Sequence, residues 1–234
     1  MIIDFSKKNR IIIIFSFIFI IFFSGLIFLR KTPDKAVLNE SNKKLNKYNI
    51  DVILEDEIKR LKCNQNIEYV NNTNSKLRSL YFHIYPNAFS KEEFAPFEKT
   101  QMNQAYPNGF NEGYISIENI IIEGKKVNYE IQGEKNDILE LKLDKPLDKN
   151  DSIYIDMKFN IKLPNSCGRF GYGQDTINIT NWFPIACVYD KKGWNTKSYE
   201  TIGDPFYSDI NDFKVKILVP AKYILGSTGN IVET

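Results

Sequence analysis

Apolar and polar side chains alternate, residue by residue, in several runs along the chain after position 47. A period of two is typical of a strand that buries one face and exposes the other. Turn signals separate the runs, at Gly124–Lys126, Gly133–Glu134 and Pro146–Asp151. The runs are Tyr48–Leu54, Leu80–Ile84, Val127–Ile131, Leu139–Leu143, Ile153–Ile161 and Phe213–Val219. We therefore expect a mostly β domain over residues 48–234, folded as an antiparallel β-sandwich.

One short helix is expected among these strands, over Ser90–Phe97. Ser90 is a good N-cap, and Glu93 follows it three residues later. Together they match the capping-box pattern that begins many helices.

The first thirty residues follow a different pattern. Ile11–Leu29 carries no charge and consists almost entirely of Ile, Phe and Leu, which at 1.5 Å per residue reaches roughly 28 Å, close to the hydrocarbon thickness of a bilayer. We expect an uncleaved transmembrane anchor here, with a cytoplasmic tail at 1–10 and a linker at 30–47. A cleaved signal peptide is the alternative, kept open by Ser24-Gly25. A short basic tail is easily retained while a long domain is translocated, so we expect a single-pass membrane protein with its bulk outside the cytoplasm.

Charge excludes one class of partner. The chain has 31 basic and 29 acidic residues, a net charge of +2. Residues 1–31 alone contribute +4, which leaves the rest at about −2. Nucleic-acid binding through a general basic surface is therefore not expected.

Few residues suit catalysis. The chain has a single histidine, His83, so it cannot supply a His-x-x-x-His zinc pair by itself. We expect His83 to be structural, with a Cys–His pair as a minor alternative. Cys63, Cys167 and Cys187 are expected to be unpaired, although a Cys167–Cys187 disulfide stays open. Gly168–Gly173 lacks the Lys-Ser/Thr of a phosphate loop and is expected to be a turn or loop between strands.

Aromatic side chains are concentrated between Phe170 and Tyr207, and both tryptophans of the chain, Trp182 and Trp194, lie there. Two interpretations remain open. These side chains form a satellite core under long loops, or they form a surface that faces a ligand or another domain.

The same segment resembles a known family. The ordered elements are Asn181-Trp182-Phe183-Pro184, Val188–Asp190, Gly193-Trp194, Gly203–Asp209, Asp212–Val215, Pro220 and Ser227–Gly229, preceded by Tyr81–Asn87. Together they resemble the N-terminal domain of the aminopeptidase N-type zinc metallopeptidases, the gluzincin aminopeptidases, in their bacterial branch. The resemblance implies a saddle-like β domain that packs over a separate catalytic domain. That second domain carries Gly-x-Met-Glu-Asn and the zinc-binding His-Glu-x-x-His, neither of which occurs in this sequence.

The resemblance therefore implies a membrane-anchored, non-catalytic domain that positions peptide for a catalytic domain absent from this chain. As given, the chain is expected to be inactive and truncated at its C-terminus, with an unpaired sheet edge near Ile224–Val232. No catalytic or metal-binding residue is assigned, and zinc is expected only in the missing domain. The residues that the resemblance implies at the substrate rim are Gln174, Asn181 and Trp182. Expected partners are membrane lipid, a peptide substrate and a separate catalytic chain. The alternative is a tethered β-sandwich that binds glycan or peptide through its aromatic patch.

Overall fold

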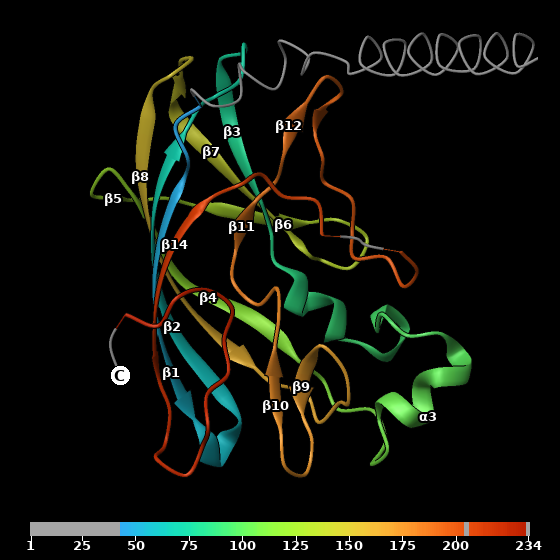
Figure 1. Ribbon diagram of the computed structural model, residues 1–234. Helices are drawn as coiled ribbons and strands as arrows, with labels where there is room; N and C mark the ends of the chain where they lie inside the picture. The colour runs from blue at the N-terminus through green and yellow to red at the C-terminus, as the bar shows by residue number, and fades with distance from the viewer. Residues whose placement is uncertain (1–42, 204–205, 233–234) are drawn as a thin grey trace, which may run out of the picture. The chain divides into compact units, whose positions relative to one another are not determined.

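The computed structural model describes residues 43–203 and 206–232, and the described residues from Lys44 onward form one compact unit. This unit is mostly β (Figure 1). Its strands are β1 (Lys47–Glu55), β2 (Arg60–Val70), β3 (Leu77–His83), β4 (Tyr114–Ile122), β5 (Lys125–Lys126), β6 (Tyr129–Gln132), β7 (Ile138–Leu147), β8 (Ser152–Lys162), β9 (Phe170–Tyr172), β10 (Ile177–Ile179), β11 (Ile185–Ala186), β12 (Tyr189–Asp190), β13 (Gly193–Trp194) and β14 (Asp212–Leu218). The helical segments are the 3-10 turns η1 (Asp56–Ile58), η2 (Tyr85–Phe89), η3 (Glu92–Phe94) and η4 (Lys99–Gln101), followed by α3 (Met102–Ala105).

The predicted membrane anchor over Ile11–Leu29 lies outside the described residues. Within the part of the chain that is described, no helix combines the length and apolarity that a membrane crossing needs.

A six-stranded sheet forms one layer, in the order β14-β1-β2-β8-β4-β5. Strands β1, β2, β8, β4 and β5 pair antiparallel, whereas β14 runs parallel to β1. The alternation read from the sequence is confirmed in β1 and β8, where every second side chain is buried. The register brings buried positions into rows across the sheet, for example Leu54, Leu61, Ile161 and Ile115.

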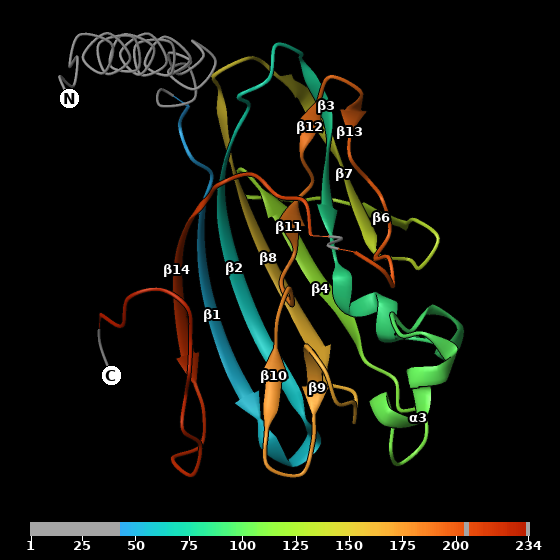
Figure 2. The same cartoon turned by 45° about the vertical axis from the view of Figure 1, so that its right-hand side comes forward.

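A four-stranded sheet, in the order β11-β3-β7-β6, forms the second layer. Its inward side chains, Leu80 and Phe82 of β3 opposite Leu141 and Leu139 of β7, are fully buried. They belong to the same hydrophobic cluster as the buried rows of the large sheet. Figure 2 shows the small sheet lying over one end of the large one. The expected sandwich is therefore present, with one parallel pair that the sequence pattern did not reveal.

A buried polar link joins the segment before β11 to the large sheet. Gln65 occupies an inward position of β2, between Ile50 and Met157, and is 1% exposed. Its Nε2 donates to the Pro184 carbonyl at 2.8 Å, and the Ala186 amide donates to the Tyr48 hydroxyl at 3.2 Å. The two donors are paired, whereas Gln65 Oε1 is buried without a partner among the described residues. Breaking either hydrogen bond would leave a further buried polar group unpaired, which is costly, so the two bonds favour one position of this segment.

Two expectations about local structure are wrong. Ser90–Phe97 does not form one helix: it holds the 3-10 turn η3, while Ser90 ends η2 and donates its hydroxyl to the Asn87 carbonyl. Pro86 at the start of η2 fits a short turn that begins earlier than the capping pattern predicted. The free sheet edge also lies elsewhere, since Ile224–Val232 contains no strand and β14 is the terminal strand of the large sheet.

Replacement of a core ring tests the layer arrangement. Phe159 is 1% exposed at the centre of β8, so Phe159→Ala should lower the free energy of unfolding by about 3–5 kcal/mol. Tyr154 lies on the opposite face of the same strand and is 56% exposed, so Tyr154→Ala should change it by less than about 1 kcal/mol. Urea unfolding followed by circular dichroism measures both. Equal losses in the two variants would contradict the assigned faces.

Candidate functional site

The outward face of the small sheet carries the candidate site. Tyr81 of β3 pairs with Glu140 of β7, which pairs with Glu130 of β6, and the side chains of these three outward positions follow one another across the sheet. The Tyr81 hydroxyl donates to Glu140 Oε1 at 2.9 Å, and Gln132 Nε2 donates to Glu140 Oε2 at 3.4 Å. Burial, aided by the hydrogen bond to Glu140, raises the pKa of Tyr81. Tyr81 is therefore a neutral donor at physiological pH.

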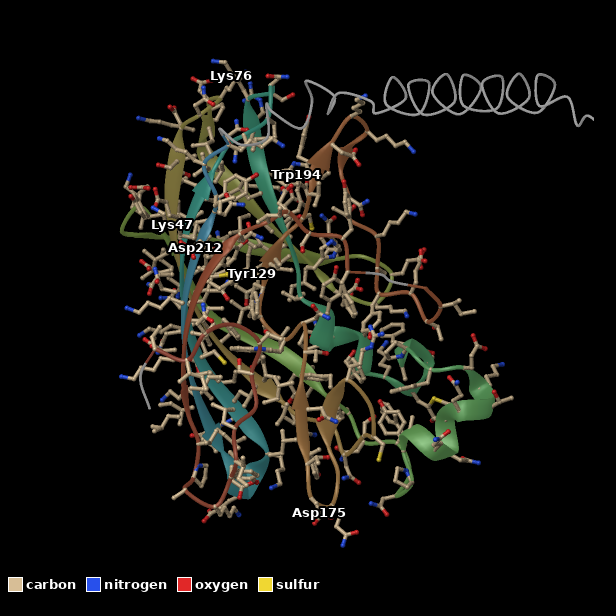
Figure 3. All side chains as sticks on the ribbon, in the orientation of Figure 1. Lys47, Lys76, Tyr129, Asp175, Trp194 and Asp212 are labelled. Atoms are coloured by element: carbon tan, nitrogen blue, oxygen red, sulfur yellow. The ribbon has the colours of Figure 1, made fainter. Side chains whose placement is uncertain are left out.

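Trp194 stands beside this face. It lies on the short β12–β13 hairpin, whose turn is fixed by the Lys192 amide donating to Asp190 Oδ1 at 2.7 Å. The Trp194 ring contacts the Tyr81 ring at 5.5 Å between centroids and meets the edge of Tyr189 at 5.2 Å. Figure 3 shows Trp194 at the end of the domain that carries the small sheet.

Two cavities lie in this part of the domain, and Tyr81 and Trp194 line the smaller one. The smaller, about 410 Å³, is lined by Tyr81, Gln132, Gly133, Ile138, Trp194 and Thr196. The larger, about 580 Å³, lies between the 133–135 turn and the 196–202 segment, with Glu98 at its side. Gly133 and Thr196 line both cavities, so the two are neighbours, and we refer to them together as the Trp194 groove.

A buried carboxylate holds one wall of the Trp194 groove. Asp137 is fully buried and accepts hydrogen bonds from Ser198 Oγ at 2.7 Å and from the Tyr199 amide at 2.8 Å. Gly133 is required next to it, because its φ is +93° and an added Cβ would lie 2.8 Å from Asp137 Oδ1. Lys135 reinforces the wall by donating to the Tyr199 carbonyl at 2.5 Å, and burial lowers the pKa of this lysine.

His83 lies under the same wall. Its ring stacks on Tyr85 at 4.7 Å, and it hydrogen-bonds to the Asn195 backbone. Burial lowers the pKa of His83 to about 4, an effect that the Asp137 carboxylate only partly opposes. The Ser198 hydroxyl is bound to Asp137, so histidine, serine and aspartate do not form a relay. The expectation of a structural histidine agrees with these contacts.

The cysteines agree with the simpler expectation. All three are free: Cys63 and Cys187 are buried and Cys167 is exposed. Burial raises the pKa of Cys187, so its thiol stays protonated and is a poor nucleophile. Among residues 43–203 and 206–232 no group of three His, Cys, Asp or Glu side chains is placed to hold a metal ion.

The residues that the resemblance implied at the substrate rim lie away from the Trp194 groove. Gln174 is exposed at the tip of the β9–β10 hairpin, next to Asp175, which Figure 3 labels at the end of the domain opposite Trp194. Asn181 follows β10 with a φ of +49°, and Trp182 is half-buried against Phe183 at 5.2 Å. Asp175 at the hairpin tip and Asn181 are six residues apart, which is at most about 20 Å at roughly 3.3 Å per residue of extended chain. The structure does not bring Gln174 together with the other two.

The aromatic segment divides between its two interpretations. Phe170 is buried, and Trp182, Phe183 and Tyr199 pack against the main core, as a satellite core requires. Trp194 also faces the groove. The sequence did not identify Tyr81, Gln132 and Glu140 as site residues. The only indication it offered was that each lies in or next to a predicted strand, at a position that points away from the core.

The sequence matches no known protein-family profile and none of the curated proteins. Solved structures do resemble it. An M1 zinc metallopeptidase from Deinococcus radiodurans is 9% identical, with a TM-score of 0.33, over 51% of this chain and 20% of its own. A two-domain M1 zinc metallopeptidase bound to L-arginine is 11% identical, with a TM-score of 0.41, over 76% and 33%. Yeast LTA4 hydrolase in complex with bestatin is 11% identical, with a TM-score of 0.29, over 52% and 15%. The chain thus spans at most a third of these three structures.

The pH dependence of stability tests the position of His83. Its folded pKa is lowered below the ordinary 6.5, so the folded state binds fewer protons than the unfolded chain. The contribution of neutral His83 to the free energy of unfolding should be fully present above pH 6.5. It should fall by up to about 3 kcal/mol as the pH drops toward 4. Urea unfolding between pH 7 and pH 4.5 measures this, with His83→Gln as the variant whose curve should be flatter. Because the chain has one histidine, its single imidazole NMR signal reports the pKa directly in a tag-free protein, and a midpoint near 6.5 would contradict burial.

Proposed function

We propose that this chain supplies the membrane-anchored, non-catalytic β domain of an aminopeptidase N-type zinc peptidase, and that the Trp194 groove holds peptide for a catalytic domain carried outside residues 1–234. The observation that carries the binding role is the groove itself, with its Tyr81–Trp194 aromatic side and its adjoining cavities. The family role is supported by the ordered sequence elements. Two of these elements have a defined place in the fold. The Pro184 carbonyl of Asn181–Pro184 accepts a hydrogen bond from Gln65, and Gly193-Trp194 lies at one side of the groove.

Peptide fits this groove better than glycan for two reasons. Strand β6 is the terminal strand of the small sheet, so an extended peptide can pair with its backbone. Both oxygens of Glu140 already accept hydrogen bonds from Tyr81 and Gln132, so fewer polar atoms are left for sugar hydroxyls. Aromatic rings also stack on sugars, so a tethered glycan-binding module is the second candidate function.

The two tryptophans allow a direct test. Trp182→Phe leaves Trp194 as the only tryptophan, and Trp194→Phe leaves Trp182 as a matched reporter outside the groove. In the full chain held in detergent, a six-residue valine–threonine peptide should shift the emission of Trp194 and leave that of Trp182 unchanged. A chitin hexamer should shift neither. A response to the glycan alone would favour the second candidate, and equal responses of both tryptophans to peptide would refute groove binding.

The family role has a separate test in the coding DNA. The reading frame after codon 234, directly or after one frameshift, should encode His-Glu-x-x-His, because the proposed catalytic domain binds zinc through that motif. Several hundred downstream codons without the motif in any frame would contradict the proposed zinc peptidase role, while leaving the peptide-binding result intact.

A further inference from the structure

Three turns of the chain meet at one end of the domain. They are the β2–β3 turn (71–76), the β7–β8 turn (148–151) and the β12–β13 hairpin. The Asn150 amide donates to the Asn71 carbonyl at 2.8 Å, which joins the first two turns. The Tyr189 hydroxyl donates to Ser75 Oγ at 3.3 Å, which places the hairpin beside them. Figures 1 and 2 both show the three turns at the same end.

This end is basic. We call it the lysine end and define it as residues 43–46, 71–76, 148–151 and 189–193. It has six lysines and three aspartates, a net charge of +3, and all six lysines are exposed: Lys43, Lys44, Lys76, Lys149, Lys191 and Lys192. Lys76 and Asp148 form an ion pair at 2.8 Å, but their side chains are 72% and 53% exposed, so the pair is weak. The positive charge of the lysine end is therefore open to solvent.

The opposite end of the domain has no such excess. It consists of the β1–β2 connection (55–60) and the tip of the β9–β10 hairpin (173–176). Together with Lys222, which binds Asp56, these residues include four carboxylates and three basic groups. Figure 3 labels Asp175 at this end and Lys76 at the other. The domain is therefore electrically polar along its length.

The described chain enters the domain at the lysine end. Asn72 Nδ2 donates to the Lys44 carbonyl at 2.8 Å, so the first described residues lie against the β2–β3 turn. The apolar run Ile11–Leu29 precedes Lys43 by only thirteen intervening residues, which reach at most about 45 Å when fully extended. Those thirteen residues include three basic and two acidic side chains, so they do not supply a negative complement to the lysines.

We propose that the lysine end docks on the surface of an anionic bilayer, with its lysines against lipid phosphate groups. The proposal rests on the membrane anchor of the proposed function, which would keep this end of the domain within reach of the lipid. Each lysine held near an anionic surface favours the docked state roughly fivefold, and the attraction acts over a Debye length of about 8–10 Å. The anchor raises the effective concentration of lipid at the lysine end, so a weak surface attraction is enough to orient the domain.

Energy transfer from Trp194 to labelled headgroups tests the docking. Trp182→Phe leaves Trp194 as the only tryptophan, on the hairpin that carries Lys191 and Lys192. The full chain is reconstituted in vesicles of phosphatidylcholine alone, or with about one-third phosphatidylglycerol, each containing a dansyl-labelled lipid. Transfer is measured as the loss of Trp194 emission when the dansyl lipid is present. It should be higher in the anionic vesicles and fall toward the neutral-lipid value at about 0.5 M salt. Equal transfer in both lipids at low salt would overturn the proposal.

Two charge-reversal variants show whether the lysine end itself is responsible. Lys149→Glu with Lys191→Glu changes two of its turns and should lower the ratio of docked to undocked domain at least roughly tenfold. Lys62→Glu with Lys158→Glu makes the same charge change at exposed positions of β2 and β8, about 20–26 Å along the strands from that end, and should leave transfer unchanged. Circular dichroism checks that both variants are folded. Equal losses of transfer in the two variants would refute a specific role of the lysine end.

A separate measurement distinguishes failure of the anchor from failure of the docking. Alkaline carbonate releases proteins that are held on a membrane by charge, whereas a membrane-spanning chain is retained, so the protein should stay with the neutral vesicles. A retained chain whose transfer does not depend on the lipid keeps the anchor and contradicts the docking. A chain that carbonate strips from the neutral vesicles refutes the anchor, and with it the docking.

Discussion

The hydrogen bond from Gln65 to the Pro184 carbonyl fixes the part of the molecule that the site depends on. Gln65 Oε1 is already buried without a partner among the described residues, and loss of the Pro184 carbonyl would leave Nε2 unpaired as well, so departure of that segment is costly. With Tyr48 holding Ala186, the chain enters β11 at one position and completes the small sheet. The hairpin that carries Trp194 begins three residues later, so its place against Tyr81 follows from a contact in the core.

The Trp194 groove is formed by covering only part of a sheet face. Tyr81 and His83 point the same way from β3, but the segment from Asn195 to Tyr199 covers His83 and leaves Tyr81 open. Asp137 binds that segment through two hydrogen bonds, so the boundary between covered and open sheet is rigid. A pre-formed wall lowers the entropy lost when a flexible ligand binds.

A strand could be predicted from the sequence where its apolar and polar residues alternate without interruption. Strand β8 was evident because all of its inward positions are apolar, whereas β2 was missed because Gln65 occupies an inward position among Leu61, Cys63 and Ile67. Strand β4 was missed because a bulge after Ile117 shifts its phase. Trp194 was noticed through aromatic density, but Tyr81, Gln132 and Glu140 meet only through sheet register, which no local pattern reveals. The placement of Gln174 rested on resemblance, and the β9–β10 hairpin carries it away from the groove.

The parallel pairing of β14 with β1 joins segments that are remote in the chain: Asn46 Nδ2, next to β1, donates to Asn211 Oδ1 across 165 residues. Ordering so long a loop costs entropy before the contact returns any stabilisation. During synthesis, the β1–β2 hairpin and its antiparallel neighbours can therefore assemble first, while the other edge of β1 waits for residues 212–218 to emerge. That interval, when Tyr48 and Ile50 are covered on one side only, is when the nascent chain is most exposed to misassociation.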